Sequence, residues 1–237
     1  MEIRGQRKCQ SCGERWSYYD TGSVTCPACG SIRSVGVDER TQHTDGTVTL
    51  DLTAARAAAA EDDFSVACEE AKTACAAYTR VRGFIDAGRF RPLDEVFVAA
   101  HELRRAARTY DRMLRPDDED TAYLLALLSG APDGDRPDSE TVTDRLRPAR
   151  GLGAATAVDA YLREFATWRA DAQTAPGLDG PLGRLRAHVR RIKALDGDVP
   201  VADTDRLVGA ARALGEYASS GEESDRETAV GHLDALG

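Results

Sequence analysis

The sequence contains no long hydrophobic run, and this absence limits where the protein can act. No stretch of about 18 apolar residues occurs, so the sequence predicts no transmembrane helix. The amino terminus lacks the hydrophobic region of a secretory signal. We therefore expect a cytoplasmic protein rather than a secreted or membrane-spanning one.

The sequence also lacks the short motifs that mark common enzyme classes. It has no phosphate-binding Gly-x-x-x-x-Gly-Lys-Ser/Thr run, no Gly-x-Ser-x-Gly nucleophile turn and no His-Glu-x-x-His pair. Gly151 and Gly153 follow no predicted strand and lack the third glycine of a dinucleotide-binding fingerprint. These absences predict a protein that is not an enzyme.

Lysine is scarce, whereas arginine and aspartate are abundant. The chain has only Lys8, Lys72 and Lys193, and its formal net charge is −9. The first 50 residues contain six basic and six acidic residues, so the acidic excess lies entirely beyond residue 50. An acidic surface repels phosphate groups, and we expect any nucleic-acid contact to be confined to the amino-terminal region. The composition resembles that of proteins from extreme halophiles.

Four cysteines near the amino terminus form two Cys-x-x-Cys pairs. Cys9 and Cys12 are separated by thirteen residues from Cys26 and Cys29. Each pair can direct two thiolates toward one point, and two pairs supply the four ligands of a closed tetrahedral zinc site. Such a site has no open position, so we expect one structural Zn²⁺ ion. Two disulfides are the alternative, but paired spacing in a chain expected in the cytoplasm favours a metal.

The residues around these pairs predict a small sheet. Residues 15–19 and 24–25 are β-formers, the four residues between them have the composition of a hairpin turn, and residues 31–37 can add a third strand. Gly13 and Gly30, one after each pair, suit the positive φ needed where amides fold back toward thiolates.

This pattern resembles a zinc ribbon over residues 6–37, similar to the ribbons of transcription factor B and of archaeal transcription and ribosomal proteins. As a whole, the chain resembles an uncharacterised family of salt-adapted archaeal proteins with an amino-terminal ribbon and a helical remainder. That resemblance implies no activity.

Aromatic and basic residues beside the cysteines are candidates for contact with a partner. The candidates are Arg15, Trp16, Tyr18, Tyr19 and Arg33. They could contact nucleic acid by stacking and phosphate pairing. The alternative is that Trp16 and one tyrosine cover the small core of the ribbon.

The sequence after residue 50 predicts helices, because apolar residues recur at steps of three and four between clusters of proline, glycine and aspartate. The predicted helices span residues 53–87, 92–115, 121–129, 155–172, 182–195, 204–218 and 223–236. The first would be about 50 Å long, with Gly88 after its end, and would form an antiparallel hairpin with the second. The acidic residues 117–120 should stabilise the start of the third helix.

Two polar segments predict the boundaries between parts of the chain. The expected parts are a zinc ribbon (1–38), a hinge (39–50), a helical hairpin plus a short helix (51–130), a linker or mobile loop (131–142) and a four-helix region (143–237). The expected fold class is mainly α: a three-stranded β zinc ribbon followed by an all-α bundle of about six or seven helices.

Two other sets of residues have a possible chemical role. Cys68 and Cys75 lie two helical turns apart, too far for a disulfide, and we expect them to pack in the core. Arg226 and His232 have a spacing similar to the catalytic motif of HEPN-class ribonucleases, and that resemblance implies phosphate binding by the arginine and proton transfer by the histidine. A chance match on an exposed helix is the alternative.

Three functions follow from these observations. The leading one is a non-enzymatic adaptor or regulatory protein that docks on a protein or nucleic-acid partner through the ribbon, with a protein partner favoured, while the helical region binds a second protein or self-associates. The second is a nucleic-acid-binding regulator of transcription or translation, with contacts through the ribbon only. The third is a HEPN-like ribonuclease.

Overall fold

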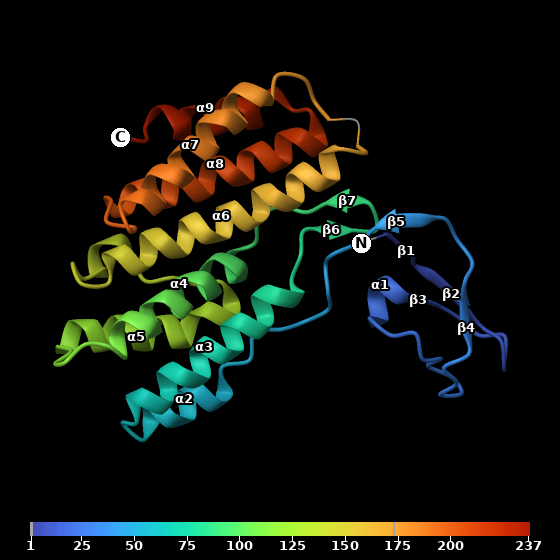
Figure 1. Cartoon of the computed structure of the whole chain (residues 1–237), viewed down its shortest axis with the longest axis horizontal. Helices are drawn as coiled ribbons and strands as arrows, with labels where there is room; N and C mark the ends of the chain where they lie inside the picture. Colours follow the sequence, from blue (N-terminus) through green and yellow to red (C-terminus); the bar gives the residue numbers. More distant parts are fainter. Residues whose placement is uncertain (1, 173) are drawn as a thin grey trace.

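Helices make up most of the protein. The computed structural model describes residues 2–172 and 174–237, and 58% of it is helical, with nine α-helices among these residues. A small antiparallel sheet lies at the amino-terminal end, beside a larger helical body (Figure 1). The predicted fold class, mainly α with an amino-terminal β ribbon, is confirmed.

The elements follow in chain order. The strands are β1 (Glu2–Arg4), β2 (Gln6–Cys9), β3 (Arg15–Ser17), β4 (Ser34–Gly36), β5 (Arg40–Gln42), β6 (Ile85–Asp86) and β7 (Arg89–Phe90). The helices are α1 (Tyr18–Thr21), α2 (Thr53–Ala60), α3 (Phe64–Val81), α4 (Glu95–Tyr110), α5 (Asp118–Gly130), α6 (Arg147–Arg169), α7 (Asp179–Ala194), α8 (Val201–Ser220) and α9 (Glu223–Asp234). Two 3₁₀ turns, η1 (Ala131–Asp133) and η2 (Ser139–Thr141), lie between α5 and α6.

The ribbon sheet has three strands in the order β3–β2–β4. Its central strand, β2, lies before the first cysteine pair, where the sequence predicted no strand. The predicted strand over residues 15–19 ends at Ser17, because the Ser17 hydroxyl accepts a hydrogen bond from the Asp20 N–H and starts α1. The expected hinge is also partly ordered, since β5 pairs with β1.

The prediction that residues 53–87 form one continuous helix is wrong. This segment breaks into α2 and α3 at Asp62, whose φ is 60°. The Asp63 carboxylate then accepts a hydrogen bond from the Val66 N–H and caps α3. This break is why the described part of the body contains eight helices, α2 to α9, where seven were predicted.

The end of that predicted helix forms a hairpin instead. Helix α3 ends at Val81, and β6 pairs with β7 across Ala87 (φ 50°) and Gly88 (φ 80°). Two successive positive φ values are the requirement of a type I′ turn, so Gly88 serves a hairpin and not a helix end. The Trp168 indole N–H donates to the Gly88 carbonyl oxygen at 2.9 Å, which fixes the hairpin on α6.

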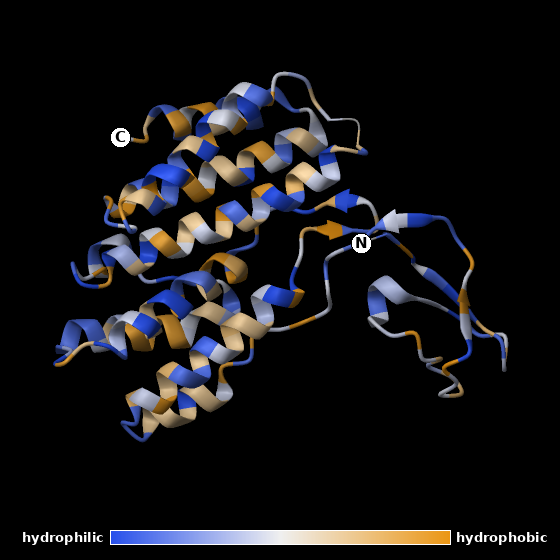
Figure 2. Ribbon diagram, viewed as in Figure 1, coloured by the Kyte–Doolittle hydropathy of each residue, from blue (hydrophilic) through white to orange (hydrophobic). Residues whose placement is uncertain are grey.

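The later helices match the prediction closely. Asp117 forms a capping box with Asp120 at the start of α5, as the acidic run predicted. Helix α6 begins at Arg147, earlier than expected, and α7, α8 and α9 lie where the apolar periodicity placed them. Each of these helices carries both hydrophilic and hydrophobic segments (Figure 2).

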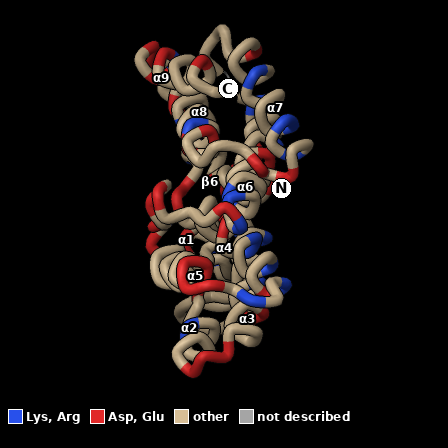
Figure 3. The backbone as a smooth tube through the Cα atoms, turned by 90° about the vertical axis from the view of Figure 1, so that its left-hand side faces the viewer, with Lys and Arg blue, Asp and Glu red and all other residues tan. Residues whose placement is uncertain are grey.

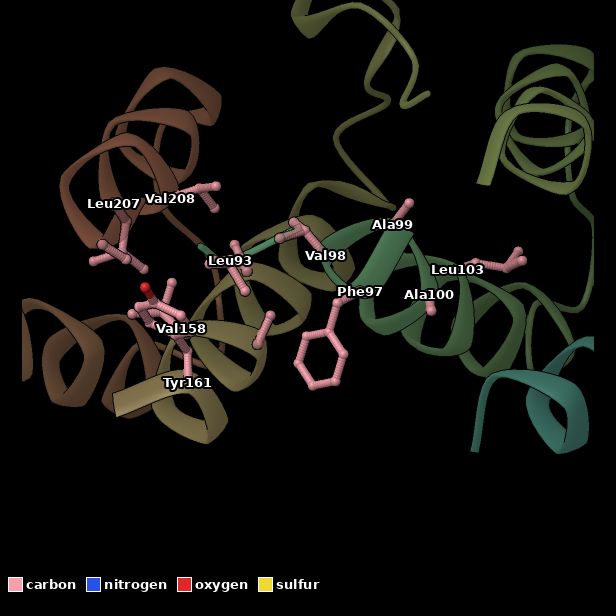
Figure 4. Close-up of a cluster of buried hydrophobic side chains, with 14 of the residues drawn as sticks. Leu93, Phe97, Val98, Ala99, Ala100, Leu103, Val158, Tyr161, Leu207 and Val208 are labelled. Atoms are coloured by element: carbon pink, nitrogen blue, oxygen red, sulfur yellow. The ribbon is translucent and has the colours of Figure 1, made fainter. Parts of the chain in front are cut away.

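A single cluster of buried apolar side chains joins all helices of the body. It extends from Leu50 to Leu236, so the expected linker at 131–142 does not separate two cores. Figure 4 shows its centre, with side chains from α4, α6 and α8. The Phe84 ring centroid lies 4.8 Å from that of Phe97 and 4.9 Å from that of Tyr161, both edge-on.

Glycine permits the close crossing of α4 and α6. A Cβ added to Gly153 would stand 2.7 Å from the Cα of Glu102. Gly153 therefore permits the approach of α4, and Gly151 permits that of the Gly197 backbone between α7 and α8. Both glycines lie within α6 and form no phosphate-binding turn.

A buried carboxylate, Glu102 of α4, is paired by side chains from three other segments. The Tyr123 hydroxyl donates to it at 2.5 Å, Arg136 lies at 3.2 Å and Arg150 at 3.4 Å. Both arginines also contact Asp205 of α8. Arg136 belongs to the expected linker, which this network holds against the body.

We expect Arg150→Met to lower the free energy of unfolding by about 2 kcal/mol, because it leaves the buried Glu102 carboxylate with Arg136 alone as its cation. The matched control is Arg184→Met, which removes an exposed ion pair with Asp234 between α7 and α9. It should cost less than about 1 kcal/mol. Urea unfolding of the two variants measures the difference, and equal costs would contradict a stabilising role for the network.

None of the helices in the described part of the chain has both the length and the apolar character needed to cross a lipid bilayer.

Candidate metal centre

The four ribbon cysteines converge on one point, as their spacing predicted. The Sγ atoms of Cys9 and Cys29 are 3.7 Å apart, those of Cys12 and Cys26 are 3.6 Å apart, and all four lie within 4.8 Å of one another. A tetrahedral ion with metal–sulfur bonds of about 2.3 Å has sulfur–sulfur edges of about 3.8 Å. The four sulfurs therefore fit a tetrahedral metal ion.

The two cysteine pairs are built in the same way. The Gly13 N–H donates to the Cys9 carbonyl and the Gly30 N–H donates to the Cys26 carbonyl, at 3.1 and 2.9 Å. Both glycines have positive φ, 83° and 69°, as predicted. Each tight turn directs backbone amides toward sulfur, and the Ser11 N–H lies 3.3 Å from the Cys9 Sγ.

The crowding of four thiols controls their ionisation. The pKa of Cys9 is lowered to about 6, mainly by a hydrogen bond from the backbone N–H of Cys12. For Cys12, the Glu14 N–H acts to lower the pKa, but the thiols of Cys29 and Cys26 and burial together raise it to about 12. The pKa of Cys29 is raised as well. Without a cation the cluster keeps some of its protons.

Disulfides do not explain this geometry. The sulfur separations are well above the length of about 2.05 Å of a disulfide bond. The donor set contains only sulfur and fills all four tetrahedral positions, so an ion held here would have no place for a substrate.

The chain matches one family model over residues 1–233, that of a family of unknown function, DUF7117. The chain belongs to the DUF7117 family. Searches of the curated proteins and of the solved structures found no match.

The five candidate partner-binding residues lie in three different environments. Trp16 is only 7% exposed, packs with Cys9 and Cys26, and its indole N–H donates to the Ser23 carbonyl at 3.0 Å. It therefore occupies the ribbon core, which is the alternative considered for it. Arg15 and Arg33 are exposed.

The two candidate tyrosines face the helical body. The ring centroids of Tyr19 and His43 are 4.7 Å apart, and those of Tyr18 and His43 are 6.5 Å apart. The Tyr19 hydroxyl is hydrogen-bonded to Thr41. Both tyrosines help to line a cleft of about 500 Å³ between the ribbon and the body. They therefore position the ribbon.

The outer face of the ribbon sheet contains residues that the candidates did not include. The register sets Arg15, Lys8 and Val35 side by side across the three strands, with their side chains on the face opposite to Trp16. Val37 continues this face two residues beyond Val35. Ile32, in the turn before β4, is 77% exposed. The alternation of Val35 and Val37 in the sequence was the signal that could have predicted this exposed apolar face.

The remaining candidates show no shared site. Cys68 and Cys75 are buried in the body core, as expected, and burial raises their pKa values to about 11 and about 12. Arg226 is paired with Glu223, and the His232 ring lies against Gly209 of α8.

We expect Cys12→Ser to abolish stoichiometric metal binding and to unfold the ribbon while the helical core persists, because the ribbon core is a separate small cluster. Elemental analysis measures the metal, and limited proteolysis compares the ribbon with the body. Cys75→Ala, a change in the helical core, is the control and should keep the metal. Retention of one metal ion per chain in Cys12→Ser would contradict the four-sulfur site.

Metal affinity should fall as the pH is lowered, because bound thiolates carry no protons whereas Cys12 and Cys29 hold theirs at neutral pH in the metal-free chain. The dependence should steepen below about pH 6, where Cys9 also becomes protonated. Competition with a chromophoric chelator at several pH values measures this. A metal affinity that stays constant between about pH 8 and about pH 5 would contradict this prediction.

Proposed function

We propose that the four cysteines bind one structural Zn²⁺ ion. Four thiolates at tetrahedral separations are the donor set that zinc favours, and a closed site supplies folding energy rather than a reactive position. Such thiolates must stay reduced, which supports a cytoplasmic location.

We further propose that the zinc ribbon is the docking module of a non-enzymatic adaptor whose partner is a protein. The observation that carries this proposal is the outer face of the ribbon sheet. It combines the exposed apolar side chains of Val35 and Val37 with the cations Lys8 and Arg15, and the exposed Ile32 precedes β4. Such a face fits a partner surface that offers apolar groups bordered by carboxylates.

A protein partner fits this face better than a nucleic acid. Single-stranded nucleic acids are held largely by stacking on exposed aromatic rings. Trp16 lies in the ribbon core, and Tyr18 and Tyr19 pack toward His43. The exposed valines offer no donor to a phosphate. The nucleic-acid-binding regulator is therefore the second candidate, supported only by the cations.

We expect Val35→Asp to reduce partner binding at least about tenfold, because it places a charge in the apolar part of the interface. The matched control is Val66→Asp on α3: Val66 is 46% exposed and Val35 is 41% exposed, so both changes add one charge at an exposed valine. Quantitative affinity capture from native cells, followed by titration of the recovered protein, compares both variants with the wild type.

Equal capture of the same partners by wild type and Val35→Asp would contradict docking through this face. Nucleic acid that co-purifies with the wild type and is lost in Lys8→Gln plus Arg15→Gln, but kept in Val35→Asp, would instead support the regulator.

A further inference from the structure

A basic cleft lies in the helical body, away from the ribbon sheet. It has a volume of about 640 Å³, runs between α3 and α4, and is also lined by Thr156 of α6. Two acidic side chains line it, Glu69 and Asp111. Six basic side chains line it: Lys72, Arg80, Arg104, Arg105, Arg108 and Arg112. Figure 3 shows basic positions gathered beside α4.

Both acidic groups of this α3–α4 cleft are engaged by the same lysine, which leaves five arginines against one net negative charge. The Lys72 ammonium lies 2.7 Å from the Glu69 carboxylate and 3.0 Å from the Asp111 carboxylate. None of the five arginines has a carboxylate within 4.0 Å among the described residues. The cleft therefore holds positive charge that the rest of the chain does not compensate.

The arginines of α4 lie along one side of the helix. Arg104 and Arg108 are separated by four residues, a rise of about 6 Å, and Arg112 follows in the turn after the end of α4 at Tyr110. Burial, followed by the charges of Arg108 and Arg104, lowers the pKa of Arg105, which indicates mutual repulsion. An anion in the cleft would relieve this repulsion.

A buried histidine also lines the α3–α4 cleft and has an unused hydrogen-bonding group. His101 is 8% exposed, and its Nε2 has no hydrogen-bond partner in the described structure. Burial, and after it the positive charges of Arg104, Arg105 and Arg163, lower the pKa of His101 to about 4. At neutral pH the ring is uncharged and carries one N–H donor and one acceptor.

We propose that the α3–α4 cleft binds a small anion that carries two or more phosphate groups, with the arginines as its principal donors and His101 as a further one. Guanidinium groups match phosphate oxygens in geometry and charge. The volume is in the range of small-molecule sites. No Phe, Tyr or Trp is among the described residues that line it, so the phosphates, and not an aromatic base, are recognised.

The test is calorimetric titration of the full-length, metal-loaded protein with inorganic tripolyphosphate at low ionic strength. We expect saturable binding of one anion per chain that weakens as salt is added. The metal content is measured after each titration, because tripolyphosphate also chelates divalent ions.

Two double variants separate the cleft from general charge attraction. Arg104→Gln plus Arg108→Gln removes two exposed arginines four residues apart on α4, and should weaken binding at least about tenfold. Arg186→Gln plus Arg190→Gln is the control: it removes two exposed arginines with the same spacing on α7, outside the cleft, and should leave the affinity unchanged. Equal losses in both variants would overturn the proposal.

The His101→Phe variant tests the buried ring. It keeps an aromatic ring against Phe97, whose centroid lies 4.7 Å away, and removes both ring nitrogens. We expect binding to weaken about two- to tenfold, the value of one hydrogen bond. Circular dichroism checks that the variant is folded. Unchanged affinity would overturn the role of His101.

Further titrations identify the source of the phosphates. Equal affinities for ATP and tripolyphosphate are expected, because the phosphate chain alone is recognised. Clearly tighter binding of ATP would overturn recognition by the phosphates alone, in favour of a nucleotide. Absence of saturable tripolyphosphate binding would overturn the proposal. Binding of a short single-stranded RNA without binding of tripolyphosphate would also overturn it, in favour of an extended strand.

Discussion

The burial of α4 is the constraint on which the helical body depends. Ten of its sixteen residues are buried, since α3, α5 and α6 cover it. A polar side chain on such a helix must find partners or remain costly. Glu102 finds Arg136, Arg150 and Tyr123, whereas the neighbouring His101 finds no partner for its Nε2. On α4, Glu102 thus holds neighbouring segments together on one side, while the adjacent His101 lines an open cleft on the other.

The ribbon is stabilised in a different way. Its buried apolar cluster contains only Cys9, Trp16 and Cys26, which is too small to hold a sheet of three short strands without further links. Four sulfurs around the proposed cation would supply those links. Because the core needs so few apolar groups, Val35 and Val37 remain on the surface.

The sequence predicted what is set by local spacing. The two cysteine pairs, the turns at Gly13 and Gly30 and the apolar faces of α7 to α9 depend on residues a few positions apart. The hairpin turn at Ala87 was not predictable, because alanine rarely adopts positive φ. Aspartate can adopt it, but the apolar periodicity of the alanine-rich stretch continues across Asp62 and favoured one helix.

Charge was the least predictable property. The excess of acidic residues beyond residue 50 suggested a body that repels phosphates. Arginines at 104, 108 and 112 look in sequence like an ordinary solvated helix face. Only the packing of α3 against α4 brings Lys72 and Arg80 beside them and pairs Lys72 with Asp111. A sum of charges over a chain does not describe their distribution in space.

Arg80, near the end of α3, lines both the α3–α4 cleft and the cleft between the ribbon and the body. The Arg80 guanidinium lies at the border of both clefts. Its long side chain has several rotatable bonds and can reorient without a change in the backbone. The same guanidinium therefore contributes positive charge to both cavities, so an anion bound in one would lower the electrostatic potential of the other.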